Sequence, residues 1–81
     1  MRLPRDLSGR ALARPLRRYG YAVTRETGSH LRLTTQHGGE HHITIPDHTS
    51  LRIGTLAGIL ADVAEHVQIP RSTLAAELFE R

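Results

Sequence analysis

The segment Gly28-Ser29-His30-Leu31-Arg32-Leu33-Thr34-Thr35 carries the alternating pattern from which the fold follows. Successive side chains of a β-strand point to opposite faces, so Leu31 and Leu33 share one face. His30, Arg32 and Thr34 share the other face. The sequence therefore predicts a strand over 30–35, in a sheet that has one face covered by helices and one face open to solvent.

One further strand is predicted before this one in the sequence, at 21–26, and another after it, at 41–45. Each carries an apolar residue at every second position. These residues are Tyr21, Val23, Ile43 and Ile45. The connections at 27–29 and 36–40 are short and contain glycine, which favours hairpins. We expect a three-stranded antiparallel meander.

Helices are predicted before and after the strands. Ser8 is a suitable N-cap for the first helix, and Gly20 is suited to the left-handed conformation that ends it. A second helix is predicted at 54–67, and a short third helix opens at Pro70. The apolar residues at helical spacing are Leu12, Leu16 and Tyr19 in the first helix, Leu56, Ile59, Leu60, Val63 and Val67 in the second, and Leu74, Leu78 and Phe79 in the third.

Pro15 lies inside the first predicted helix. Proline has no N–H to donate to the Ala11 carbonyl, and in a helix interior it costs about 3 kcal/mol. We therefore expect a distortion of this helix near Ala11.

The predicted fold class is α+β, with two layers and the order α-β-β-β-α followed by a short C-terminal helix. The helices pack on one face of the antiparallel sheet and leave the other face open. A polar patch is expected on that open face, and its members are His30, Arg32, Thr34, His42 and Thr44.

The chain has 81 residues, near the size at which one core barely offsets chain entropy, so we expect a single domain over 1–81. It has no cysteine, which excludes disulfides and cysteine zinc sites. No stretch approaches the roughly 20 apolar residues of a membrane span, and the apolar region of a signal peptide does not follow residues 1–6. We expect a cytoplasmic protein with no membrane association.

All eleven basic residues are arginine, and the formal net charge is +3. The planar guanidinium fork suits phosphate, so nucleic acid is the expected partner. The aromatic residues Tyr19, Tyr21 and Phe79 are expected in the core, which leaves no platform for stacking single-stranded bases. Recognition should therefore depend on shape and backbone. Arg14, Arg17 and Arg18 are better interpreted as a solvated helix face than as nucleic-acid contacts.

Several short motifs resemble those of the HicA family of bacterial toxins. They are Leu7-Ser8-Gly9-Arg10, Gly20-Tyr21, Gly28-Ser29-His30, Ile45-Pro46-Asp47-His48 and Gly54-Thr55-Leu56. The resemblance implies a fold like that of double-stranded-RNA-binding domains, and an mRNA endoribonuclease that inhibits translation without a metal or another cofactor. It also implies a HicB-type antitoxin protein that masks the toxin, and it assigns the catalytic histidine to His30.

The residues agree with such chemistry on physical grounds. Metal-free RNA cleavage needs a base for the 2′-hydroxyl, and an imidazole with a pKa near ~6.5 serves at neutral pH. Arg32 lies about 7 Å further along the same strand face and is suited to hold a phosphate. His48 and His42 are candidates for the general acid. The predicted RNA contacts are Gly28, Ser29, Arg32, Arg10 and Arg52.

Two alternatives remain open. One is a non-catalytic RNA-binding module of the same fold. The other is a metal-binding protein that uses imidazoles around the second hairpin, for which the candidate ligands are His37, His41, His42 and His48. The spacing fits no standard zinc pattern, and neighbouring strand residues such as His41 and His42 point to opposite faces. We therefore expect no metal.

The arginine content predicts that affinity for RNA falls steeply as salt concentration rises, because each phosphate contact releases counterions. Fluorescence anisotropy with a labelled RNA, repeated over a salt series, measures this dependence. The logarithm of the association constant should fall linearly with the logarithm of the salt concentration. An affinity that hardly changes would contradict binding through phosphates.

Overall fold

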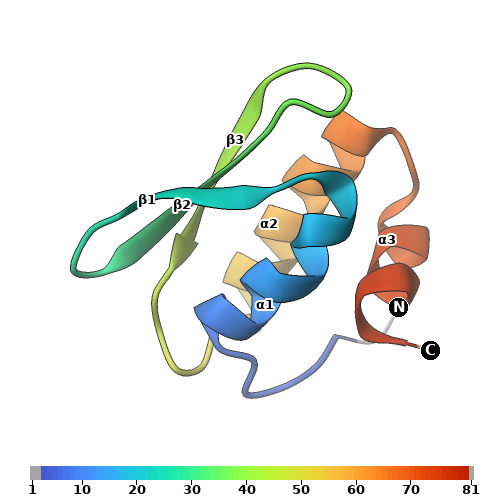
Figure 1. Cartoon of the computed structure of the whole chain (residues 1–81). Coiled ribbons are helices and arrows are strands. Elements are labelled where there is room, and N and C mark those ends of the chain that lie inside the picture. Colours follow the sequence, from blue (N-terminus) through green and yellow to red (C-terminus); the bar gives the residue numbers. More distant parts are fainter. Residues whose placement is uncertain (1–2, 81) are drawn as a thin grey trace.

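The sheet has the strand order β1-β2-β3, with the leucine-bearing strand at its centre. The computed structural model describes residues 3–80, so the extreme ends of the predicted 1–81 domain lie outside the described residues. The elements are α1 (Gly9–Leu16), a 3₁₀ helix η1 (Arg17–Tyr19), β1 (Ala22–Glu26), β2 (His30–Thr35), β3 (His41–Pro46), α2 (Ile53–Val67) and α3 (Arg71–Phe79) (Figure 1). Both strand pairs are antiparallel, which confirms the predicted α+β architecture.

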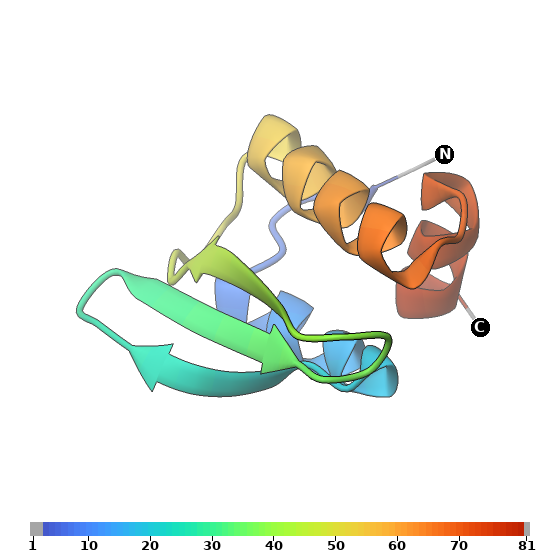
Figure 2. The same cartoon turned by 90° about the horizontal axis from the view of Figure 1, so that it is seen from above.

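The helices and the sheet form two layers. Helix α1 packs against all three strands, α2 packs against β3, and α3 packs against the two other helices (Figure 2). Within residues 3–80, no helix is long and apolar enough to cross a membrane.

The covered face of the sheet forms the core, as the alternation predicts. Leu31, Leu33 and Ile45 are at most 1% exposed. They pack with apolar residues of α1 and α2, including Leu12 and Leu60. Burying such a side chain stabilises the fold by about 1.5–3 kcal/mol, so the alternation of β2 contributes directly to stability.

Helix α1 begins where the sequence predicts but ends earlier. The Ser8 hydroxyl accepts a 3.0 Å hydrogen bond from the Ala11 amide, so Ser8 is the N-cap. The α-helix continues past Ala11 to Leu16, and the change to 3₁₀ geometry follows Pro15 instead of preceding it. Because Pro15 is the penultimate residue of α1, the hydrogen bond it cannot make belongs to the last turn. Gly20, with φ of 85°, ends η1 in the predicted left-handed conformation.

The predicted apolar face of the first strand is wrong. Tyr21 is buried but precedes β1, and every residue of β1 itself is exposed, including Val23 at 44%. Strand β1 is an edge strand, and α1 has only eight residues, so the helical layer does not close over it. Tyr19 and Phe79, predicted for the core, are only partly buried at its margin.

Gly9 places the first turn of α1 in direct contact with the end of β3. A Cβ atom at this position would lie 2.1 Å from the Pro46 carbonyl oxygen, far inside van der Waals contact. The Gly9 amide also donates a 3.0 Å hydrogen bond to the His48 carbonyl. Only glycine permits this approach of the two backbones.

We expect Gly9→Ala to destabilise the protein by about 1–3 kcal/mol, because the added methyl group forces α1 away from β3. Urea denaturation measures the free energy of unfolding. Gly58→Ala is the matched control, since Gly58 lies inside α2 and a methyl group added there would meet no atom within 4 Å. That change should stabilise the protein by about 1 kcal/mol. Equal effects of the two substitutions would contradict the packing described for Gly9.

Candidate nucleic-acid interface

The open face of the sheet carries the predicted polar patch. Cross-strand partners share a face, and β2 pairs with β3 so that Arg32 lies opposite Thr44 and Thr34 lies opposite His42. All of these residues are exposed except Thr34, which is half-buried. His30 lies at the first position of β2, at the end of the same face. The alternation therefore placed all five members correctly.

The backbone of His30 is fixed by the turn that precedes it. The Thr27 amide donates to the His30 carbonyl at 3.0 Å, and the His30 amide donates to the Thr27 hydroxyl at 3.2 Å. In addition, Asp47 donates its amide to the Ser29 carbonyl at 2.9 Å. The start of β2 is thus attached to the loop that follows β3.

The His30 imidazole is exposed and has one protein partner in the part of the chain that the structure describes. Its Nδ1 atom lies 3.0 Å from the Ser29 hydroxyl oxygen. For Nε2 we find no hydrogen bond among residues 3–80, so this atom is open to a ligand. The ring is consequently oriented through one nitrogen and available through the other.

His42 and His48 differ in the hydrogen bonds that their imidazole rings make. His42 Nδ1 lies 2.7 Å from the Thr34 hydroxyl, and His42 Nε2 lies 2.8 Å from a Glu40 carboxylate oxygen. The second bond is the main reason why the pKa of Glu40 lies below its ordinary value. His48 is exposed in the loop beside Asp47, and its carbonyl accepts from the first turn of α1. Within residues 3–80, the His48 imidazole makes no side-chain hydrogen bond, whereas both ring nitrogens of His42 have partners.

Arg10 is held by two carboxylates. It donates to Asp47 at 3.1 and 2.9 Å and to Glu26 at 2.9 Å. These hydrogen bonds, first to Asp47 and then to Glu26, raise the pKa of the guanidinium. A phosphate would have to compete with both carboxylates for this side chain. Arg10 thus joins α1 to β1 and to the loop after β3.

The other predicted RNA contacts, Arg52, Gly28 and Ser29, are exposed. Arg52 lies at the N-terminal boundary of α2, and Gly28 and Ser29 form the turn before His30. Gly28 does not have a positive φ, and a Cβ there would meet no atom within 4 Å. The fold therefore does not require glycine at this position. The absence of a side chain leaves space for the backbone of another molecule to approach.

The structure places the candidate metal ligands His41, His42 and His48 in different parts of the fold. His41 faces the helices, whereas His42 faces the open side and His48 lies beyond the far end of β3. Among residues 3–80, no group of three potential ligands is arranged to hold a metal ion.

His41 belongs instead to a polar chain at the edge of the core, which the sequence did not indicate. Its Nε2 donates to Asp62 at 3.1 Å, and its Nδ1 lies 2.7 Å from the Tyr21 hydroxyl oxygen. The ring stacks on His66 with centroids 4.3 Å apart. Burial, together with the charge of Asp62, raises the pKa of Tyr21 to about 12. This chain satisfies a buried hydroxyl and joins β3 to α2.

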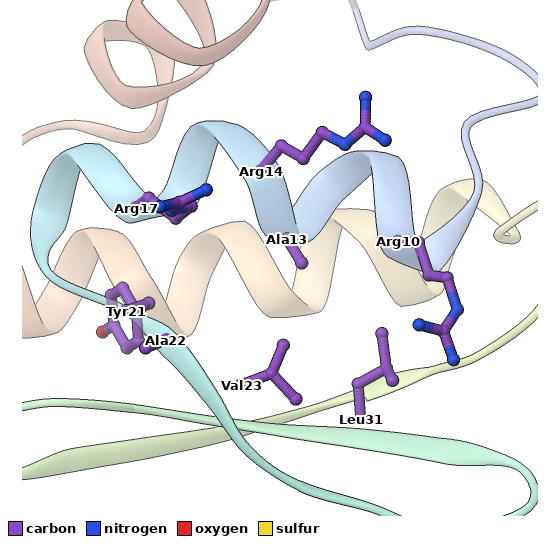
Figure 3. A pocket seen from close by; sticks show the side chains of 8 residues that line it. All are labelled: Arg10, Ala13, Arg14, Arg17, Tyr21, Ala22, Val23 and Leu31. Atoms are coloured by element: carbon purple, nitrogen blue, oxygen red, sulfur yellow. The ribbon is translucent and has the colours of Figure 1, made fainter.

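On the helix side of the sheet, a groove of about 400 Å³ runs between α1 and β1. Figure 3 shows Val23 and Leu31 pointing from the sheet toward α1, with Arg10 reaching down from the helix. Arg14 of α1 and Arg17 of η1 lie above these apolar side chains. The groove explains the exposure of Val23, and it lies on the opposite side of the sheet from His30.

Comparison with known proteins identifies the family. The family model described as the HicA toxin of bacterial toxin-antitoxin systems matches residues 9–64, from the start of α1 almost to the end of α2. No curated protein and no solved structure matches the chain. The matched segment spans more than half of the chain and includes the whole sheet. The chain therefore belongs to the HicA family of toxins.

Proposed function

We propose that this protein is a toxin that cleaves mRNA without a metal ion, with His30 as the general base and Arg32 as a phosphate ligand. The observation that supports this proposal most strongly is the position of His30. Its exposed imidazole is held by Ser29 through Nδ1, and it lies at the end of a polar sheet face that also carries Arg32. A toxin of this family has an antitoxin as its partner, and we propose that this partner is a HicB-type protein.

The proposed reaction begins with the 2′-hydroxyl of the RNA as nucleophile. In the tautomer in which His30 Nδ1–H donates to Ser29, the Nε2 lone pair accepts the proton of this hydroxyl. The 2′-oxygen then attacks the neighbouring phosphorus, and the P–O bond to the 5′-oxygen of the next nucleotide breaks. The products are a 2′,3′-cyclic phosphate and a 5′-hydroxyl end.

Two further groups are needed along this path. Arg32 lies about 7 Å from His30 along the strand and is suited to stabilise the negative charge that develops on the phosphate oxygens. The departing 5′-oxygen needs a proton, which the exposed imidazole of His48 supplies in its charged form. His42 is less suited to this role because both of its ring nitrogens already have partners, Thr34 of β2 and Glu40 of the hairpin loop.

Replacing His30 by alanine should lower the rate of RNA cleavage by about 10²–10⁴-fold, the contribution expected of a positioned base. RNA binding and antitoxin binding should remain, since the side chain is exposed. Cleavage is followed with a fluorescently labelled mRNA fragment, in excess EDTA, which should leave the wild-type rate unchanged. His37→Ala is the matched control, because it removes another exposed imidazole, in the hairpin at the opposite end of β2.

Each outcome of this experiment separates the alternatives. Cleavage by His30→Ala at the wild-type rate would refute the role of His30. A wild-type protein that binds RNA but never cleaves it would be the non-catalytic RNA-binding module. Loss of activity in EDTA would point to a metal-dependent reaction.

A further inference from the structure

Strand β1 contains a bulge that changes which of its residues face solvent. Val23 pairs with Leu33 on the covered face, but the next pair along the strand joins Arg25 to Arg32. Thr24 is the additional residue. Simple alternation from Val23 would place Arg25 toward the helices, whereas the bulge places it on the open face beside Arg32.

The same bulge also redirects Glu26. Its partner in the sheet is Leu31, which faces the helices, and its carboxylate meets Arg10 of α1 at 2.9 Å. The carboxylate next to Arg25 in the chain is therefore committed to the other side of the sheet. The hydroxyl of Thr24 lies 2.9 Å from the Thr34 hydroxyl and 3.3 Å from the Arg32 carbonyl, which holds the bulge against the central strand.

The result is a pair of like charges directly opposite each other. Directly opposed residues of an antiparallel pair have Cβ atoms about 4.5–5.5 Å apart, and like charges at this distance destabilise a sheet. Neither Arg25 nor Arg32 forms an ion pair within residues 3–80. The charge of Arg32 acts on Glu40, but the Glu40 carboxylate is already bonded to His42.

Two other arginines of the structure, Arg10 and Arg18, have partners that use their charge or their donors. Arg10 has two carboxylates, and Arg18 donates to the Glu77 carbonyl. By contrast, the guanidinium groups of Arg25 and Arg32 are both exposed. No hydrogen bond or ion pair within the described residues, 3–80, uses the donors of these two guanidinium groups, so they can meet an anion. Two guanidinium forks on one face match the geometry of phosphate oxygens.

We propose that Arg25 and Arg32 together bind the RNA backbone through its phosphates, with Arg25 as a binding residue that the sequence pattern conceals. This inference rests on the proposed function and extends it. The RNA strand passes His30 at the end of β2 and continues across Arg32 toward Arg25 on the edge strand. The repulsion between the two arginines is relieved when phosphate binds between them.

The test measures RNA affinity in the His30→Ala background, so that cleavage does not interfere. Adding Arg25→Gln should weaken binding about threefold to tenfold at low salt, and it should reduce the salt slope by about 0.7 for a single-stranded RNA. The same substitution should raise the thermal unfolding midpoint, because it removes the repulsion with Arg32. Arg25→Lys should retain the salt slope, since it keeps the charge.

Arg71→Gln is the matched control. Arg71 is exposed at the start of α3, which packs on the helices and not on the open face, and the substitution removes the same charge. It should change neither the salt slope nor the unfolding midpoint appreciably.

If Arg25→Gln binds RNA with the slope and affinity of its parent, the inference about Arg25 is wrong even though the proposed function stands. Equal losses for Arg71→Gln and Arg25→Gln would also refute it, because they would indicate an effect of net charge alone. A wild-type chain that fails to cleave RNA contradicts the proposed function instead, and the binding measurements remain interpretable.

Discussion

The contact between Gly9 and Pro46 constrains the end of the molecule where the candidate site lies. Because Gly9 has no side chain, the first turn of α1 reaches the backbone at the end of β3 and donates to the His48 carbonyl. The loop after β3 is thereby held close to α1, and Asp47 connects it to the turn before His30. Three segments distant in sequence meet here. The position of the candidate base follows from this junction as much as from β2 itself.

The two faces of the sheet differ in how their charges are paired. On the helix side, Arg10 is neutralised by Glu26 and Asp47. On the open side, Arg25 and Arg32 oppose each other without an ion pair to a described carboxylate. A single extra residue in β1 produces this division, because it turns one arginine outward and the following glutamate inward. The electrostatic character of the open face thus depends on strand register and not on net charge.

The sequence was sufficient for the features that depend on local periodicity. Alternation predicted the covered and open faces of β2 and β3, and capping rules predicted Ser8 and Gly20. Features that depend on pairing between strands could not be predicted from the sequence. Arg25 was missed because nothing local marks Thr24 as a bulge, and the exposure of Val23 follows from the short helix above it.

Long-range contacts account for the remaining differences between the predicted and the observed structure. The requirement for glycine at position 9 arises from the Pro46 carbonyl, which is distant in the chain. Arg10 was expected to contact RNA, and its two carboxylate partners come from different parts of the fold.

The central claim is that RNA binds on the open face of the sheet, next to His30. Nuclear magnetic resonance tests it most directly, by titrating isotopically labelled protein with an RNA strand whose 2′-hydroxyl groups are methylated, so that it cannot be cleaved by the proposed route. The account predicts that the signals of the His30 ring and of the Arg25 and Arg32 guanidinium groups shift most. Shifts confined to α2 and α3, with these signals unchanged, would contradict it.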